Sequence, residues 1–151
     1  YRKGSYMNLS EIKIMVVQDI EFDETELDKE SLRIPQLHNK YLVFLTDEKI
    51  MLEKYQQELR VLVRKKWLYY TGKMSEEELT ENDWEPFNLN ILKSDVDKFI
   101  ESDTEILRSR TIVRMQEEKI NYLDSVVKSI NGRQWNIRAA IDWMKFTHGI
   151  Q

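Results

Sequence analysis

Apolar residues return at seven-residue intervals through two long stretches of this chain. In the first stretch, no glycine or proline interrupts the sequence between Pro35 and Gly72. Its repeat has two lines, one through Leu45, Leu52 and Leu59 and one through Tyr41, Tyr55, Leu62 and Tyr69. In the second stretch the same spacing joins Phe99, Ile106, Val113, Ile120 and Val127. Such a repeat is typical of long helices that pack along one another.

The ends of both stretches carry residues that start and stop helices. Proline suits the first turn of a helix and glycine suits the position after its end, so the first stretch predicts a helix from Pro35 to Thr71. Ser94 is a favourable N-cap for the second helix, which is predicted over Asp95–Asn131 and ends at Gly132. Two helices of equal predicted length and equal repeat indicate an antiparallel hairpin.

Two segments precede the hairpin. Asn8, followed three residues later by Glu11, forms the pattern of a capping box and predicts a helix from about Leu9 to Ile20. The many β-branched residues of this segment also permit a strand. The acidic residues of 19–30 come next without a glycine, which favours a solvated acidic loop over a calcium-binding loop.

Three further segments complete the predicted architecture. Ser75 with Glu78 forms a second capping box, so a short helix is predicted up to about Asp83. Residues 84–93 alternate apolar and polar side chains around Pro86, which predicts a short strand or an extended arm. Such an arm can cover its own core or reach a neighbouring subunit. A final helix is predicted over residues 133–147.

Together these elements predict an all-α fold, a long antiparallel helical hairpin with short N-terminal, connecting and C-terminal helices and one short arm. Residues 1–6 are interpreted as an artificial leader ahead of a natural start at Met7, and 7–151 as a single helical domain. Within it, 7–34 form the N-terminal helix and acidic loop, 35–131 the hairpin with its connection at 73–94, and 133–149 a C-terminal oligomerisation helix.

Composition limits the function classes. The chain carries a net charge of −4, which becomes −6 when Arg2 and Lys3 are removed with the leader. A chain this acidic is not a general binder of polyanions, so a nucleic-acid site must be a local basic patch. The absence of cysteine excludes disulfides and fits a reducing cytoplasm. No apolar run approaches the ~20 residues that a membrane-spanning helix needs.

The residues of enzyme active sites are missing from the pattern. The two histidines, His38 and His148, have no partner at metal-ligand spacing. Neither a glycine-rich phosphate loop nor a serine elbow occurs. Asp97 and Glu101 lie four apart on a predicted helix, where an exposed pair of carboxylates is more common than a metal site. We therefore expect a protein without catalytic activity, cofactor or metal.

A basic segment stands out at the end of the first long helix. Residues 60–73 hold five positive charges and no negative one. On a helix, Arg60, Arg64 and Trp67 fall within about 60° of each other, pointing away from the apolar repeat, and Lys65 flanks them. Guanidinium groups beside an indole suit single-stranded nucleic acid, whose phosphates need charge and whose unstacked bases need a flat surface.

The alternatives for this segment stay open from its residues alone. Lys66 occupies a leucine position of the repeat, so either its stem packs while its ammonium reaches water, or the ammonium lines a channel. The whole segment could also be a solvated helix end, whose cations complement the negative end of the helix dipole.

Charged residues also follow the second long repeat, at Asp103, Arg110, Glu117 and Asp124. One interpretation is ion pairing between subunits that sets their register. The other is a narrow apolar seam with these residues at its wet edge, which we favour for any single pair.

The chain resembles the UvsY family, the recombination mediators of T-even-like bacteriophages. The likeness rests on the basic run before Tyr69-Tyr70-Thr71-Gly72, on the helix start Leu92-Lys93-Ser94-Asp95, and on Arg133-Gln-Trp-Asn-Ile137-Arg138 leading to Phe146-Thr-His-Gly149. It extends over nearly the whole chain after Met7, and the order and spacing of the motifs carry it.

The resemblance implies a ring-like homo-oligomer of six or seven subunits in the cytoplasm of an infected bacterial host. Such proteins bind single-stranded DNA and help a RecA-like recombinase load onto strands covered by single-strand-binding protein. By position, the family's DNA-binding residues correspond to Arg64 and Lys66, with Lys65 between them; with the adjoining cations and the indole, the expected DNA-binding set is Arg60, Arg64, Lys65, Lys66, Trp67 and Lys73. The expected oligomerisation residues are Trp135, Ile137, Ile141, Trp143 and Met144.

A different function class fits the same heptads and acidic balance. A non-catalytic coiled-coil scaffold or adaptor would bind only proteins. Retention of a labelled oligonucleotide at low salt separates the two hypotheses.

Overall fold

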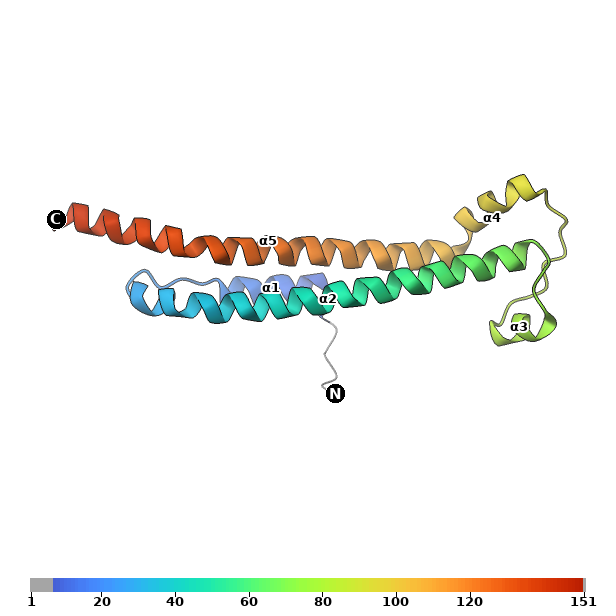
Figure 1. Cartoon of the computed structure of the whole chain (residues 1–151), viewed down its shortest axis with the longest axis horizontal. Coiled ribbons are helices and arrows are strands. Elements are labelled where there is room, and N and C mark those ends of the chain that lie inside the picture. Colours follow the sequence, from blue (N-terminus) through green and yellow to red (C-terminus); the bar gives the residue numbers. More distant parts are fainter. Residues whose placement is uncertain (1–6, 151) are drawn as a thin grey trace. The chain divides into compact units, whose positions relative to one another are not determined.

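The computed structural model describes residues 7–150, which contain α-helices, one short 3₁₀ turn and no strand (Figure 1). The elements are α1 (Leu9–Asp19), α2 (Leu27–Tyr70), α3 (Glu76–Glu81), η1 (Lys93–Asp95), α4 (Val96–Ser102) and α5 (Thr104–Thr147). The all-α prediction is confirmed. Residues 1–6, interpreted as a leader, lie outside this range. None of the helices in it is long and apolar enough to cross a membrane.

The two long helices are each 44 residues in length, but α2 begins earlier than predicted. It starts at Leu27, and Pro35 lies inside it rather than in its first turn. A proline in a helix interior removes one backbone hydrogen bond and costs about 3 kcal/mol. Pro35 is exposed, as is Ser31, whose carbonyl loses that bond and can be hydrated instead. Acidic residues in the new first turn, Asp28 and Glu30, favour the earlier start through the helix dipole.

The predicted stop at Gly132 is also wrong, because α5 continues through it to Thr147. A glycine in a helix interior costs about 1 kcal/mol relative to alanine. Ile130 and Ile137, on either side of Gly132, are both buried. Their packing offsets the weak propensity, so the C-terminal helix is the end of α5 and not a separate element.

The second long helix instead breaks where no break was predicted, at Asp103. This residue is extended (φ −65°, ψ 129°) and separates α4 from α5. Its Oδ1 accepts hydrogen bonds from the backbone N–H groups of Glu105 at 2.9 Å and Ile106 at 3.1 Å. Aspartate is a strong N-cap, so it starts α5. Ser94, the predicted cap, lies in η1, and no side-chain cap bond precedes α4.

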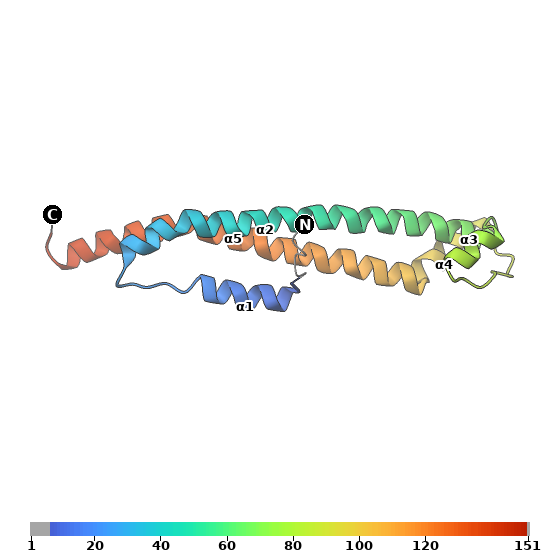
Figure 2. The same ribbon diagram turned by 90° about the horizontal axis from the view of Figure 1, so that it is seen from below.

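The described residues form two compact units. The first unites the chain up to Lys49 with the chain from Glu118 onward. In it the start of α2 and the end of α5 run antiparallel, and α1 lies beside them (Figures 1 and 2). The Asn8–Glu11 capping box of α1 is confirmed. The buried apolar side chains of this unit are Ile12, Val16, Leu37, Tyr41, Leu45, Ile120, Leu123, Val126, Ile130 and Ile137.

Polar contacts close the first unit around its core. Tyr41 donates to Asp19 Oδ2 at 2.7 Å, and Arg133 donates to the carbonyl of Ile20 at 2.5 Å. Lys119 pairs with Glu48 at 3.2 Å, with both side chains mostly buried. The first two bonds connect α1 and the loop after it to α2 and α5, and the ion pair connects α2 to α5.

The second unit is Ile50–Glu117. Its core consists of Val96, Ile100 and Ile106, with Leu59, Leu62, Val63, Tyr70 and Ile91 packed against them. The capping box of Ser75 and Glu78 at α3 is confirmed. Residues 84–92 are extended and form no strand, and Ile91 packs on the core of its own unit. The seam of α2 therefore faces inward here as predicted.

The charged positions of the second long repeat differ from one another. Arg110 is exposed, and Asp124 pairs with Lys128 at 2.6 Å on the same helix, which fits the wet-edge interpretation. A second line of buried residues in α5 lies one position before the charged line in each heptad. Its members are Gln116, Leu123 and Ile130. Asp103 is the exception, because it is buried.

Candidate nucleic-acid interface

The last turn of α2 places Lys73 above Trp67. Gly72 adopts φ +70°, a left-handed conformation that glycine reaches without strain. The N–H of Gly72 donates to the carbonyl of Tyr69 at 3.2 Å and that of Lys73 to the carbonyl of Leu68 at 3.0 Å. These two bonds form a Schellman motif, which turns the chain back over the helix. The ammonium of Lys73 consequently lies 4.6 Å from the centre of the Trp67 ring.

The other exposed members of the predicted set follow the same side of α2. Trp67 is 40% exposed, and Arg64 and Arg60 are exposed one and two turns before it, respectively. Arg60 forms a surface ion pair with Glu53 at 3.2 Å. Lys65 is half-buried and donates to the side chain of Asn82 at 3.1 Å. Arg60, Arg64, Trp67 and Lys73 thus present a continuous cationic and aromatic surface, which we call the α2 strip.

Lys66 lies elsewhere, in the interior of the second unit. Only 5% of its side chain is exposed, and its ammonium pairs with Asp103 Oδ2 at 3.0 Å and with Glu105 Oε1 at 3.3 Å. It also lies 3.9 Å from the centre of the Trp84 ring. The structure therefore fits neither sequence interpretation: the ammonium does not reach water, and it is paired in a buried site rather than lining a channel.

The partners of Lys66 are themselves hydrogen-bonded. Tyr70 donates to Asp103 Oδ2 at 2.7 Å, and the indole N–H of Trp84 donates to Glu105 Oε1 at 2.8 Å. We call Lys66, Tyr70, Trp84, Asp103 and Glu105 the Lys66 network. Burial opposes the charge of Asp103, but the hydrogen bonds from Tyr70 and Ile106 and the ammonium of Lys66 hold its pKa below the ordinary value. Burial and the neighbouring Asp103 carboxylate raise the pKa of Tyr70.

An aromatic cluster attaches the connecting segment to the end of α2. Phe87 lies 5.0 Å from Tyr70 and 5.8 Å from Phe99 between ring centres, both edge to face. Tyr69 contacts Trp84 edge to face at 5.3 Å and donates to the carbonyl of Glu85 at 2.7 Å. The segment before α4 is therefore held beside the Gly72 turn.

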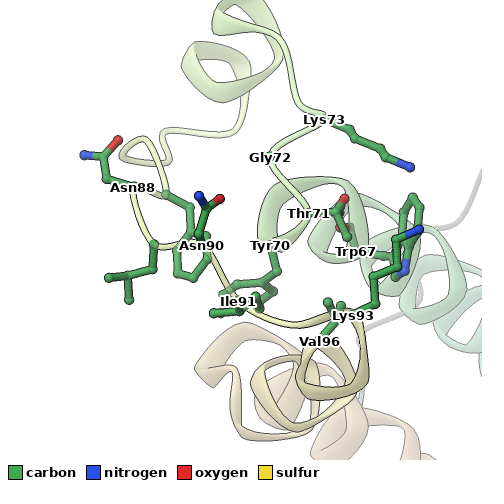
Figure 3. A pocket seen from close by; sticks show the side chains of 12 residues that line it. Trp67, Tyr70, Thr71, Gly72, Lys73, Asn88, Asn90, Ile91, Lys93 and Val96 are labelled. Atoms are coloured by element: carbon green, nitrogen blue, oxygen red, sulfur yellow. Dashed lines mark hydrogen bonds between the residues drawn. The ribbon is translucent and has the colours of Figure 1, made fainter.

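This arrangement forms a pocket of about 310 Å³ between the end of α2 and residues 87–96. Trp67, Tyr70 and Lys73 line it from α2 and its turn, and Asn90 and Lys93 line it from the connecting segment. In Figure 3 both lysine side chains extend to the Trp67 side of the pocket, and Asn90 projects from the connecting segment.

Sequence reasoning did not assign Asn90 or Lys93 to the site. Lys93 was noted only within a helix-start motif, 20 positions after Lys73 along the chain. The sequence signal that pointed to it was the alternation of residues 84–93, since an extended segment with an apolar edge must pack that edge on a core. Phe87 and Ile91 do so, and Lys93 is placed beside Trp67 as a result.

The predicted oligomerisation residues lie at the end of α5, in the first unit. Ile137 is buried, at 4% exposure, in the core of its own chain. Trp135 and Trp143 are about two-thirds exposed, and Ile141 and Met144 are exposed as well. Trp143 stacks on Phe146 with ring centres 5.8 Å apart. Apart from Ile137, these apolar side chains are exposed within the described residues.

Comparisons with known proteins agree on one family. The family model described as "Recombination, repair and ssDNA binding protein UvsY" matches residues 15–150. No curated protein matches the chain by sequence. A crystal structure of the bacteriophage T4 recombination mediator protein UvsY superposes with a TM-score of 0.80 at 17% identity, covering 93% of this chain and 99% of that chain. A second crystal form gives 0.78 at 19% identity, covering 95% and 99%. At these identities the structures show a shared fold.

Proposed function

This chain belongs to the UvsY family, and on that premise we propose that it is a phage recombination mediator that binds single-stranded DNA along the α2 strip. In this role it assembles as a homo-oligomer and helps a RecA-like recombinase load onto strands covered by single-strand-binding protein. The cytoplasm of the infected host is where such a role would be carried out.

The observation that carries the DNA assignment is the α2 strip itself. It combines three cations with an exposed indole, which Lys73 contacts directly, on a chain whose net charge is −4. Charge attracts the phosphates of a single strand, and a flat ring stacks on unpaired bases of any sequence. Lys66 supports this surface from inside, because its network fixes the end of α2 against α5. We therefore assign direct DNA contact to the strip, with Lys65 at its flank, and a positioning role to Lys66.

Binding of a labelled oligodeoxythymidine, measured by fluorescence anisotropy across a salt series, tests this assignment. For single strands the log–log salt slope is about −0.7 per phosphate contacted. The double variant Arg60→Ala/Arg64→Ala should bind more weakly and lose about 1.4 from the slope. The matched control is Lys54→Ala, an exposed cation on α2 outside the strip. Unchanged affinity and slope in the double variant would refute the strip as the DNA site.

The uncovered apolar end of α5 supports self-association. Exposed large apolar side chains, and two tryptophans in particular, are typical of protein–protein interfaces. We assign Trp135, Ile141, Trp143 and Met144 to contacts between subunits, with Ile137 packing inside each subunit. A ring of six or seven copies would repeat the α2 strip and convert weak sites into tight binding by avidity.

Light scattering after size exclusion tests the assembly. Trp143→Ala should shift the mass toward smaller species. The control is Leu32→Ala, since Leu32 is an isolated apolar side chain with 77% exposure in the same unit. A monomeric wild type at micromolar concentration would refute self-association, and a Trp143→Ala assembly of full mass would exclude this surface.

The alternative of a scaffold or adaptor that binds only proteins draws support from the same apolar end of α5. The anisotropy experiment separates the two functions. A wild-type protein that assembles but retains no oligonucleotide at low salt is a scaffold, whereas salt-dependent retention favours the mediator.

A further inference from the structure

The pocket beside Trp67 has a composition unlike the rest of the chain. Two of its lining side chains, Lys73 and Lys93, are cationic, and none is a carboxylate. Neither lysine forms an ion pair among the residues that the structure describes. On an acidic chain, a pocket with two unneutralised ammonium groups selects an anionic ligand.

The shape of the pocket restricts that ligand to a small flat group. Its volume of about 310 Å³ lies at the lower end of the range for ligand sites. Trp67 and Tyr70 supply aromatic walls, and the amide of Asn90 supplies both a donor and acceptors. Aromatic walls bind a base by stacking, and an amide pairs with the polar edge of a base.

Lys73 occupies the face of Trp67 on which a base would stack. Lys73 now covers one face of Trp67, in a cation–π contact of 4.6 Å. A base that stacks on this face displaces the ammonium, which is then free to meet the phosphate of the same nucleotide. After the exchange the indole stacks on the base and the ammonium pairs with the phosphate, so neither group loses its contact without gaining another.

Lys93 reaches the pocket from the opposite segment of chain, at the start of η1. Two cations from different segments of chain therefore meet beside one aromatic wall, and the two phosphates that flank a nucleoside offer one charge to each of them. We propose that this pocket takes one nucleotide out of a bound single strand, with its base against Trp67, its edge at Asn90 and its flanking phosphates at Lys73 and Lys93. This inference rests on the proposed function and adds a defined step to it.

The first test compares two lysines in the same part of the chain. Lys93→Ala should lower the affinity for oligodeoxythymidine about threefold or more and reduce the magnitude of the salt slope by about 0.7, the value for one phosphate. Lys98→Ala is the matched control, because Lys98 is exposed and pairs with Asp95 outside the pocket. Both residues are on the surface, and circular dichroism checks that the variants fold. A Lys93→Ala protein equal to the control overturns the pocket assignment.

Photocrosslinking locates the base directly. Oligonucleotides that carry 5-iodouracil should crosslink to Trp67 or Tyr70, as identified by mass spectrometry. Asn90→Ala should reduce the yield at least twofold relative to Asn121→Ala, a change of an exposed asparagine outside the pocket. Crosslinks only at other aromatic residues would overturn the proposal even if binding persists. A mononucleotide at millimolar concentration should not displace the strand; displacement would assign the pocket to free nucleotides instead.

These experiments distinguish failure of the nucleotide-pocket proposal from failure of the proposed DNA-binding function. If the wild type binds no oligonucleotide, the proposed function fails. If the wild type binds and Arg60→Ala/Arg64→Ala weakens it while Lys93→Ala does not, the α2 strip stands and the pocket alone is excluded.

Discussion

The two sides of the last three turns of α2 carry similar charges in opposite surroundings. On the outer side, Arg64 is exposed and Trp67 is two-fifths exposed. On the inner side, Lys66 is buried and paired with two carboxylates. A phosphate can approach the outer cations without breaking any buried contact. To reach Lys66 it must first separate an ion pair that burial keeps from water.

The difference shows that a count of basic residues overstates the charge available to a ligand. Five cations fall in residues 60–73, but one is neutralised inside the fold and another, Arg60, is paired at the surface. The inner cation belongs to stability and the outer cations to binding. Substitutions on the two sides of α2 should separate these two roles.

Removal of Lys66 should have the largest effect, and on stability. Lys66→Ala leaves two carboxylates in a partly buried site without their cation, which costs about 3–5 kcal/mol in the free energy of unfolding. Urea unfolding measures this loss. Lys66→Met keeps much of the apolar stem and isolates the charge. If Lys66→Ala is as stable as the wild type but binds DNA tenfold more weakly, the inner cation contacts DNA and the comparison fails.

Acid should weaken the same network to a smaller extent. The folded pKa of Asp103 is lowered, so its contribution to stability is present above the ordinary pKa of 3.8 and is lost as the pH falls below it. Asp103→Asn retains a good N-cap but has no charge to titrate. The unfolding free energy of this variant should therefore change less than that of the wild type between about pH 5 and pH 2. If the unfolding free energies of the variant and the wild type depend equally on pH, Asp103 does not cause the loss of stability in acid.

On the outer side, Trp67→Ala should weaken DNA binding by about 1–3 kcal/mol, the range for one stacked base. Its unfolding free energy should change less than that of Lys66→Ala, because Trp67 is two-fifths exposed whereas Lys66 is buried. Trp84→Phe is the contrasting variant, since it loses the indole bond to Glu105 inside the network. It should lower stability while the DNA affinity of the folded protein is kept. If Trp67→Ala lowers stability and Trp84→Phe weakens DNA binding instead, Trp84 contacts DNA and Trp67 does not.

The smallest difference is expected between the two arginines of the strip. Arg60 is paired with Glu53, whereas Arg64 has no ion pair within residues 7–150. Arg64→Ala should therefore weaken oligonucleotide binding more than Arg60→Ala, by a few tenths of a kcal/mol, because a surface pair is worth less than about 1 kcal/mol. Glu53→Gln supplies the check, since it should make the two variants more alike. Anisotropy at low salt resolves the difference.

Much of the fold followed from periodicity and caps. The seven-residue repeats predicted the paired long helices, and both capping boxes were located from residue spacing. The break at Asp103 was missed because the apolar spacing of Phe99 and Ile106 continues across it. A seven-residue repeat shows which side chains face inward. One extended residue between two helices hardly changes those positions, so the repeat does not reveal the break. Pro35 and Gly132 misled because other contributions offset their local penalties. At Pro35 the freed carbonyl is exposed to water, and at Gly132 the buried neighbours Ile130 and Ile137 hold the helix.

The site was predicted on one helix only. The outer positions of α2 follow from 3.6-residue periodicity, so the strip was assigned from the sequence. Lys66 shared the same charge run, and nothing in that run identifies the carboxylates of Asp103 and Glu105 as its partners, nearly forty residues away. Lys93 was missed for the same reason. Contacts between distant segments depend on how the connecting chain packs, which spacing within one helix does not report.

The distance between Trp67 and Lys73 depends on the direction in which the Schellman turn at Gly72 leaves α2, and the number of helical residues before the turn sets that direction. Each helical residue adds about 100° of rotation, so one residue inserted between Trp67 and Gly72 would swing the turn by that angle around α2. Lys73 would then leave the indole, although every side chain of the strip would still be present. An insertion in the five positions that follow Trp67 should therefore weaken DNA binding although it removes no residue of the strip.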